Sequence, residues 1–465
     1  MSEPILEFYF DIQCPYAYIA STRIESLVQR SGSKLVLKPV LLGGIYSDTR
    51  APHGKGSATD AMAPAKKILH SEDLFRHIAK YKIPFMWNDQ HPVRSVDAMR
   101  LFHAIPDQYR IRLMHRLFRL YWVENGDISN ADTLIKIADE LAIPGVDKNT
   151  FSRPEVKESL QRVTTEAVSR GAIGVPTFFI PGAGEDGEGE LFWGQDRMHF
   201  VEATLRSIAK GGNGSCGAWK EVDDLVSLIP RSVPSWQVKQ KTHLTFYFDF
   251  SSPWSYLGLM SLRHHLLKLA GPLVEVEYVP VLVGGLFRDI GTPIVPMEVA
   301  SEAQRALGSR DMYRWVDWWR AIGHQTREPE LANLELNYPS DFPLRTPLPL
   351  RVFLLQPETL EAIFKAGWVH DRNIGNPAVL TQVLNENGFP GEALVQAVEE
   401  NKNDVKEQLK RCNERALKTG LCGVPSYQVN HGPVVWGHDR YNIVMDMLAG
   451  WTAESSQPNH AGAKL

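Results

Sequence analysis

The stretch FYFDIQCPYAY, residues 8–18, decides the fold of the first half of this chain. Its apolar start, Phe8 to Phe10, predicts a short buried strand. The proline that follows Cys14 suits the first turn of a helix, where its missing N–H is not needed. We therefore expect a strand that leads into a helix, with Cys14 at the helix N-terminus. The terminal N–H groups and the helix dipole favour negative charge there, which predicts a lowered pKa for the Cys14 thiol.

The same pattern returns as FYFDFSSPWSY, residues 246–256, with Ser252 in the place of Cys14. A second signature lies near the end of each copy: GVPT at 174–177 and GVPS at 423–426. Apolar residues follow each one, and then WGQDR at 193–197 or WGHDR at 436–440. The spacing between the two signatures differs little between the copies. This order predicts a tandem duplication of one whole domain.

The repeat and the composition set the expected domain boundaries. We expect one domain over residues 1–210, a linker over 211–241, a second domain over 242–451 and a C-terminal tail over 452–465. The linker is indicated by its Gly and Pro content. Two domains also suit a chain of 465 residues better than one core does.

Each domain is expected to run strand, helix, strand, helical region and hairpin. In the first copy the strands are expected at 5–10 and 34–40, parallel to each other, with a helix over 15–30 between them. Gly-rich loops are expected at 41–57 and 283–293, at the strand end where parallel α/β sheets bind ligands. The stretch at 312–323 carries three tryptophans at helical spacing. It favours a core or domain-interface stripe, with the lining of an acceptor-substrate pocket as the alternative.

Composition narrows the function classes. The net charge is −4 and no basic stripe occurs, so nucleic-acid binding has little support. No run approaches the roughly 18 apolar residues of a membrane span. The four cysteines form neither a disulfide framework nor a zinc-ligand spacing, so we expect no metal and a reducing compartment. The last three residues, Ala463-Lys464-Leu465, are similar to a peroxisomal address. They favour import into the peroxisome by its receptor, with the cytoplasm as the alternative.

Neither copy has the second cysteine of a dithiol enzyme. Disulfide oxidases use Cys-x-x-Cys because the second thiol releases the mixed disulfide, but Ala17 and Ser255 stand at that position here. The residues therefore favour chemistry on a bound thiol. Two structural interpretations stay open: Ser252 as a plain helix N-cap, and Cys14 as a small buried apolar residue.

Taken in order, these motifs resemble those of the kappa-class glutathione transferases and of their relatives, the 2-hydroxychromene-2-carboxylate isomerases. The resemblance covers nearly the whole chain, twice. It implies an α/β fold of two thioredoxin-like (DsbA-like) domains, each with a helical insertion. It also implies an internal pseudo-dimer or a homodimer, glutathione as cosubstrate, and a small-molecule second substrate.

The resemblance implies roles for the matching residues. Ser252 and Cys14 would contact the glutathione sulfur. Val175 and Val424, each in a cis peptide with the next proline, would pair with the glutathione main chain. An aspartate and its preceding residue would hold the γ-glutamyl end. The implied glutathione-binding residues are Pro15, Tyr16, Val175, Pro176, Gln195 and Asp196 in the first copy, and Pro253, Trp254, Val424, Pro425, His438 and Asp439 in the second.

The sequence also departs from the family and from its own symmetry. A kappa-class asparagine is matched by Ala51 and Thr292, which puts one glutathione contact in doubt. Cys14 of the first copy aligns with Ser252 of the second, and Gln195 aligns with His438. A Cys14 thiolate would repel a glutathione thiolate, and a histidine titrates near neutral pH. We therefore expect copy one to bind reduced glutathione more weakly, or to form a mixed disulfide with its oxidised form, and copy two to bind in a pH-dependent way.

The leading function is a glutathione-dependent isomerase or transferase that acts on an aromatic or electrophilic small molecule. Two alternatives stay open. One is a thiol-disulfide oxidoreductase that uses Cys14 with glutathione, and the other is a non-catalytic thioredoxin-like binding protein.

Overall fold

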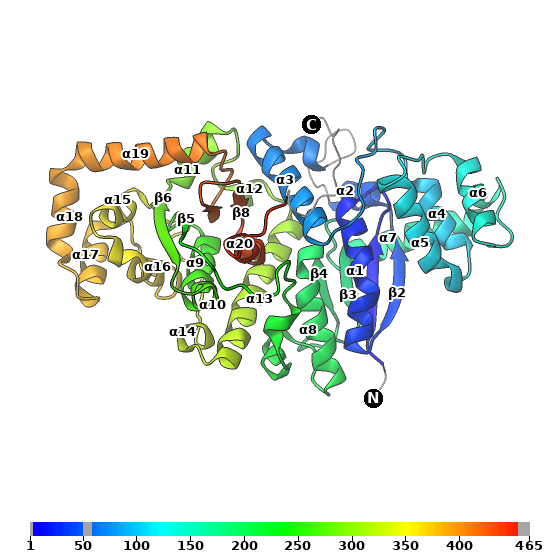
Figure 1. Ribbon diagram of the computed structural model, residues 1–465, viewed down its shortest axis with the longest axis horizontal. Helices are drawn as coiled ribbons and strands as arrows, with labels where there is room; N and C mark the ends of the chain where they lie inside the picture. Colours follow the sequence, from blue (N-terminus) through cyan, green and yellow to red (C-terminus); the bar gives the residue numbers. More distant parts are fainter. Residues whose placement is uncertain (1–2, 50–57, 454–465) are drawn as a thin grey trace.

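A computed structural model describes residues 3–49 and 58–453 of the chain. Two lobes lie side by side along the longest axis, the N-terminal copy from blue to green and the C-terminal copy from green to red (Figure 1). Helices α3 (Pro64–Lys80), α13 (Glu302–Thr326) and α20 (Tyr441–Leu448) lie where the lobes meet. Ala51 and the tripeptide 463–465 lie outside the described residues.

Each lobe contains one small mixed sheet, and the two sheets have the same order. The first runs β2-β1-β3-β4 and the second β6-β5-β7-β8. The first strand of each copy pairs in parallel with the second and antiparallel with the third. The strands are β1 Ile5–Phe10, β2 Lys34–Pro39, β3 Thr177–Ile180, β4 Glu190–Trp193, β5 Thr242–Phe248, β6 Val274–Pro280, β7 Ser426–Val429 and β8 Val434–Trp436. This identity of order confirms the duplication.

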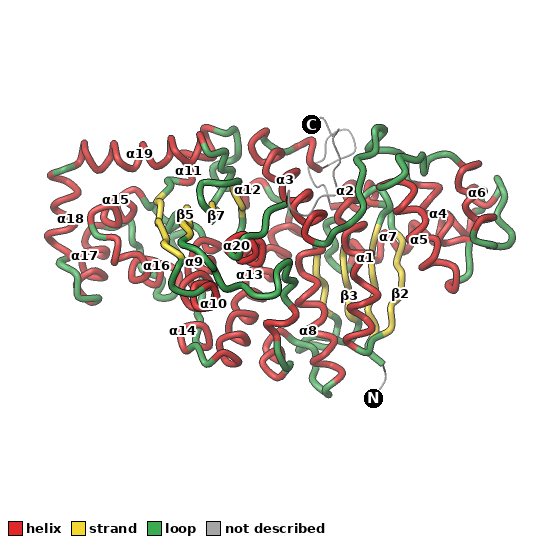
Figure 2. The backbone as a smooth tube through the Cα atoms, in the orientation of Figure 1, coloured by secondary structure: helices red, strands yellow, loops and turns green. Residues whose placement is uncertain are grey.

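Helices surround both sheets (Figure 2). In copy one they are α1 Pro15–Ser31, α2 Leu42–Thr49, α3, α4 Val96–Ala104, α5 Asp107–Trp122, α6 Ala131–Glu140, α7 Pro154–Ser169 and α8 Met198–Ala209. In copy two they are α9 Pro253–Ser261, α10 Leu267–Ala270, α11 Val283–Asp289, α12 Pro296–Val299, α13, α14 Pro329–Ala332, α15 Pro347–Leu355, α16 Leu360–Trp368, α17 Pro377–Glu386, α18 Gly391–Glu400, α19 Lys402–Lys418 and α20. The helical insertion between the second and third strand of each copy is confirmed. Among the described residues, no helix combines the length and the apolar character that a bilayer span requires.

The two regions expected as Gly-rich loops begin instead with short helices, α2 and α11. The cause is a buried carboxylate at the end of the first strand of each copy. Asp11 Oδ2 accepts the Leu42 N–H at 2.9 Å, and Asp249 Oδ2 accepts the Val283 N–H at 2.8 Å. Each bond satisfies a free N–H group at the start of the helix. Tertiary contacts thus outweigh the poor helix propensity of the glycine pairs.

The linker over residues 211–241 is packed on the protein. It forms two short 3-10 helices, Cys216–Glu221 and Leu225–Leu228, and the side chains of Trp219 and Trp236 are buried. Trp236 Nε1 donates to Asp446 in α20 at 2.8 Å. Asp446 also pairs with Lys80 at the end of α3, and both side chains are almost completely buried. One buried ion pair therefore connects copy one, the linker and copy two.

The tryptophan stripe lies on α13, and Trp315, Trp318 and Trp319 are fully buried. Trp315 and Trp318 pack against Phe200 of copy one, with ring centroids 4.8 and 5.3 Å apart. Trp319 packs against Tyr441 of copy two at 4.9 Å. The domain-interface interpretation is therefore confirmed.

Candidate active site

In each copy, a cysteine or serine stands directly before a helix that begins with proline. Cys14 has extended backbone angles (φ −91°, ψ 117°) before α1, and Ser252 has nearly the same angles (φ −105°, ψ 117°) before α9. The Val175-Pro176 and Val424-Pro425 peptides are both cis, as expected. The structure therefore places the same backbone arrangement at both sites.

The two halves of the sequence signature meet through these side chains. Cys14 Sγ donates to the Val175 carbonyl at 3.1 Å, and Ser252 Oγ donates to the Val424 carbonyl at 3.3 Å. Ser252 Oγ also accepts the Ser255 N–H at 3.2 Å, so it caps α9 as well. The N-cap interpretation of Ser252 is therefore confirmed, and its role at the thiol site stays a prediction. A hydroxyl or thiol donor thus lies next to the cis-proline loop in both copies.

The expected lowered pKa of Cys14 is wrong. The side chain is only 6% exposed, and burial raises the thiol pKa to about 12. The N–H groups of Ala17 and Tyr16 lower it, but by less than burial raises it. The nearby carboxyl of Asp11 raises it further. Cys14 is therefore a neutral thiol at pH 7 and acts as a hydrogen-bond donor.

Iodoacetamide should alkylate Cys14 slowly in the native protein at pH 7. The thiolate is the reactive form, so the rate should rise about tenfold per pH unit up to at least pH 10. Peptide mass spectrometry after timed quenching would measure this rate. The same cysteine in urea-unfolded protein, where burial is lost, is the control and should react much faster. An apparent pKa in the native protein below about 8.5, the value of a free cysteine, would contradict the buried thiol.

The aspartates expected at the γ-glutamyl end lie in short 3-10 turns, Gln195–Arg197 and His438–Arg440. The two turns face each other across the domain boundary. Arg440 Nη1 donates to Asp196 Oδ2 at 2.6 Å, and Arg197 Nη2 donates to Asp439 Oδ2 at 2.9 Å. Each copy thus supplies an arginine to the aspartate of the other. This reciprocal exchange is the pattern of a two-fold interface.

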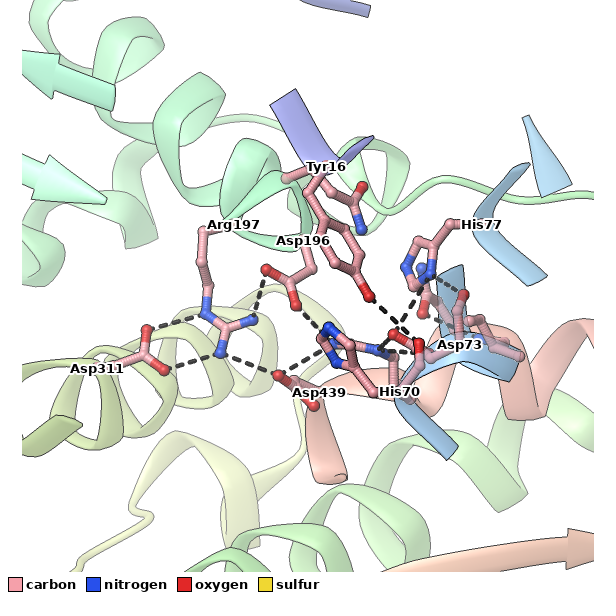
Figure 3. A network of polar contacts seen from close by, with 12 residues as sticks. Tyr16, His70, Asp73, His77, Asp196, Arg197, Asp311 and Asp439 are labelled. Carbon is pink, nitrogen blue, oxygen red and sulfur yellow. Dashed lines mark hydrogen bonds and ion pairs between the residues drawn. The ribbon is translucent and has the colours of Figure 1, made fainter. Parts of the chain in front are cut away.

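A second pair of carboxylates follows the same symmetry. Arg197 forms a two-pronged ion pair with Asp311 of α13, with both bonds at 2.9 Å. Arg440 binds Asp73 of α3 through Nε alone, which donates to both carboxylate oxygens at 2.9 and 3.0 Å. Figure 3 shows Arg197 between Asp196, Asp311 and Asp439, contributed by both copies. Despite burial, the two guanidinium groups lower the pKa of Asp196 and of Asp439.

The residues after the helix-start prolines lie beside this cluster. Tyr16 lies near Asp196 and Asp73 (Figure 3), and its hydroxyl donates to the His70 carbonyl at 3.4 Å. In copy two, Trp254 stacks on His438 with ring centroids 4.8 Å apart. Burial lowers the pKa of His438 to about 4. The expected pH-dependent binding through His438 near neutrality is therefore wrong.

Helix α3 of copy one also reaches the site of copy two. Leu69 belongs to the buried apolar cluster that contains Val424 and Cys422. The Lys66 ammonium lies 5.4 Å from the centre of the Trp436 ring. The second site is therefore built partly from the first copy.

Both copies of the chain match one known protein family. A family model described as a DSBA-like thioredoxin domain matches residues 5–206 and again residues 243–449. The chain belongs to this family. A 2-hydroxychromene-2-carboxylate isomerase from Sphingobium xenophagum is 24% identical over 201 residues, 43% of this chain and 97% of the relative. Glutathione S-transferase kappa 1 from Rattus norvegicus is 26% identical over 214 residues, 43% of this chain and 90% of the relative.

A solved structure of 2-hydroxychromene-2-carboxylate isomerase is also similar, at 21% identity and a TM-score of 0.38, over 44% of this chain and 97% of that one. Both protein groups inferred from the motifs are thus among the relatives of this DSBA-like chain. The two matched ranges agree with the tandem duplication.

Sequence reasoning missed four residues of this cluster: the two arginines that bind Asp196 and Asp439, and the two carboxylates that bind those arginines in turn. Arg197 and Arg440 follow those aspartates in both copies, and this repetition is a signal that points to a shared role. Both arginine side chains are largely buried, with 11% and 15% of their surface exposed. Asp73 and Asp311 carry no comparable signal, because their role depends on how the two copies face each other.

One further cluster has the spacing of metal ligands. Ligand atoms of His264, Glu330 and Glu361 all lie within 4.8 Å of one another. The Lys365 ammonium pairs with Glu330 at 2.8 Å and with Glu361 at 2.9 Å. A cationic group thus already binds these carboxylates.

Proposed function

We propose that the chain is a glutathione-dependent isomerase or transferase whose main site lies in copy two. The observation that carries this proposal is the Ser252 hydroxyl at the start of α9. It lies 3.3 Å from the carbonyl of the cis Val424-Pro425 peptide, and Ser255 rather than a cysteine stands three residues later. Such a site can hold a bound thiol as an anion, but it offers no second thiol for disulfide exchange.

The residues of copy two would divide the work as follows. Ser252 would turn its O–H from the Val424 carbonyl to the glutathione sulfur, and the N-terminus of α9 would add to the stabilisation of S⁻. The backbone of Val424 would pair with the glutathione main chain. Asp439 would hold the γ-glutamyl ammonium, and Lys66 supplies positive charge near the same loop.

The reaction follows from a stabilised thiolate. In isomerisation, the sulfur adds to an electron-poor carbon of a conjugated substrate, and the electron pair moves to the substrate carbonyl oxygen. Rotation about the new single bond follows, and the C–S bond then breaks to return the thiolate. In transfer, the C–S bond persists and a leaving group departs with its electron pair. Both routes suit an aromatic or electrophilic second substrate.

Copy one is proposed as a binding site of lower activity. Cys14 is more buried than Ser252, which is half-buried. Because the Cys14 thiol is neutral, it would not repel a bound thiolate. Charge repulsion therefore gives no reason to expect weaker glutathione binding in copy one. The same neutral thiol counts against the alternative of a Cys14 thiol-disulfide enzyme, since exchange requires the thiolate.

Calorimetry with reduced glutathione, paired with an assay on a nitro-activated aryl chloride, tests the proposal. We expect saturable binding in the full chain and glutathione-dependent release of chloride. Heat without turnover on this substrate or on conjugated enones would favour the non-catalytic binding protein. Absence of binding would show that glutathione is not the thiol that this chain binds.

We also propose a peroxisomal location through Ala463-Lys464-Leu465. A fluorescent protein fused after Leu465 should mask the tripeptide and give a diffuse signal, while an N-terminal fusion should stay punctate. Punctate signal from both fusions would rule out this address.

A further inference from the structure

A second serine lies in the same helix turn as Ser252. Ser255 belongs to the first turn of α9, and its N–H donates to Ser252 Oγ at 3.2 Å. The side chain of Ser255 is fully buried, and its hydroxyl has no hydrogen-bond partner among the described residues. Buried polar atoms are nearly always paired, so this hydroxyl points to a bound group as its partner.

The spacing of the two serines brings the second hydroxyl close to a thiol that the first one holds. Ser255 stands at the position of the second cysteine in Cys-x-x-Cys enzymes. Residues that form a disulfide have Cβ atoms roughly 3.5–4.5 Å apart, so this helix turn brings its first and fourth side chains together. A sulfur bound at Ser252 would therefore lie within reach of the Ser255 hydroxyl as well.

Another unpaired hydroxyl lies beneath the same helix. Tyr427 of β7 is 1% exposed, and its hydroxyl has no hydrogen-bond partner in the described part of the chain. A Cβ atom at Gly258 would lie 2.9 Å from this hydroxyl, so Tyr427 reaches the buried face of α9 one turn after Ser255. Burial raises the pKa of the Tyr427 phenol, so its O–H stays a donor at neutral pH.

Copy one has apolar residues at both positions. The repeat aligns Ser255 with Ala17, and Tyr427 with Phe178. Ala17 and Phe178 are completely buried, so the fold needs no hydroxyl at either place. Copy two therefore carries two buried O–H groups that packing does not require, on the buried side of the helix that begins at Ser252.

We propose that Ser255 donates a second hydrogen bond to the sulfur of glutathione in copy two, and that the Tyr427 hydroxyl adds its dipole from the same side. This inference rests on the proposed function and adds a catalytic residue to the same site. A hydrogen bond to a charged sulfur is stronger than one to a neutral thiol, so both groups favour the thiolate. Copy one lacks both donors, which makes copy two the copy that activates the thiol.

The charged and titratable groups around the site act in both directions. Asp249 at the end of β5 is a buried carboxylate, which disfavours a nearby thiolate. Lys66 of α3 favours it, and Asp439 is paired with two arginines. His438 and Cys422 are neutral at pH 7, because burial lowers the pKa of the imidazole to about 4 and raises the pKa of the thiol to about 12. Substituting the two hydroxyl residues changes none of these charges.

The pH dependence of turnover tests the second donor. At saturating concentrations of both substrates, the acid limb of the profile reports the pKa of the bound thiol. Ser255→Ala installs the residue of copy one and should raise this pKa by about one pH unit, with about tenfold lower turnover at pH 7. Because the lost hydroxyl is unpaired in the protein, stability toward urea should stay equal or rise. An unchanged pKa of the bound thiol in Ser255→Ala would overturn the inference.

Two further variants and a second measurement complete the test. Ser261→Ala removes another buried hydroxyl of α9, which donates to the Gly258 carbonyl at 3.1 Å, and should leave the pKa of the bound thiol unchanged. Tyr427→Phe should raise that pKa by less than Ser255→Ala does. If Ser255→Ala does not fold, an unchanged pKa in Tyr427→Phe overturns the inference.

The ultraviolet absorbance of the bound thiolate gives the same pKa without turnover. A lowered pKa in the native chain that Ser255→Ala leaves in place would overturn this inference alone. Absence of glutathione binding, or a bound thiol with the pKa of free glutathione, would overturn the proposed function and this inference with it.

Discussion

Replacing Ser252 with alanine should lower glutathione-dependent turnover by about 10²-fold. Among the described residues of copy two, the Ser252 hydroxyl is the side-chain donor to the Val424 carbonyl, which precedes the cis proline. Without it, the thiolate loses a hydrogen bond that is strongest when the sulfur is charged. Steady-state kinetics at saturating glutathione would measure the loss.

Two matched variants separate chemistry from folding. Ser252 also caps α9, so alanine should cost about 1 kcal/mol of stability, too little to unfold the protein. Ser252→Cys places the residue of copy one at this position, keeps a donor, and should retain turnover within about tenfold of the native protein. Ser251→Ala removes the neighbouring hydroxyl and keeps the Ser251 N–H bond to Asp249, so it should leave the rate unchanged. Native turnover in Ser252→Ala would show that the site lies elsewhere.

Replacing Lys80 with methionine should lower the free energy of unfolding by about 3–5 kcal/mol. The change keeps the side-chain volume but leaves the carboxylate of Asp446 buried without its cation. The Ser232 N–H and the Trp236 indole still donate to Asp446, yet neither carries a charge. Urea titration followed by tryptophan fluorescence would measure the loss.

An exposed ion pair gives the matched control for Lys80. Lys402 and Glu399 pair at 3.0 Å on the surface, with both side chains more than half exposed. Lys402→Met should change stability by less than about 1 kcal/mol. The double variant Lys80→Met with Asp446→Asn should recover much of the loss, because both buried charges are removed and the amide oxygen can still accept from Trp236. A loss in Lys80→Met no greater than in Lys402→Met would contradict a buried ion pair that links the copies.

Local sequence patterns predicted those parts of the site that local contacts build. The apolar run before Cys14 and the proline after it were enough for the strand-to-helix turn, and the same held at Ser252. In both places a few adjacent residues determine the backbone. The cis state of the two Val-Pro peptides was expected from the family resemblance, and both are cis.

The remaining parts depend on contacts between distant residues. Glycine pairs predict loops, and α2 forms because Asp11 accepts an N–H group 31 residues away. A cysteine at a helix start predicts a thiolate, and the Cys14 thiol stays neutral because the surrounding fold buries it. The pairing of Arg197 with Asp439 spans 242 residues and depends on the way the copies dock. Sequence periodicity carries no information on such docking.

The joining of both copies in one chain has a consequence for how such a protein can change. In a homodimer of identical subunits, every substitution appears on both sides of the two-fold axis. Here a single codon alters one side alone. The Lys80–Asp446 pair is an example, because Trp318 rather than a second lysine stands on α13 at the position related to Lys80 by the repeat. The linker also keeps the copies at a high effective concentration at any dilution. The duplication within one chain thus leaves the residues of one candidate site free to change while those of the other are kept under selection.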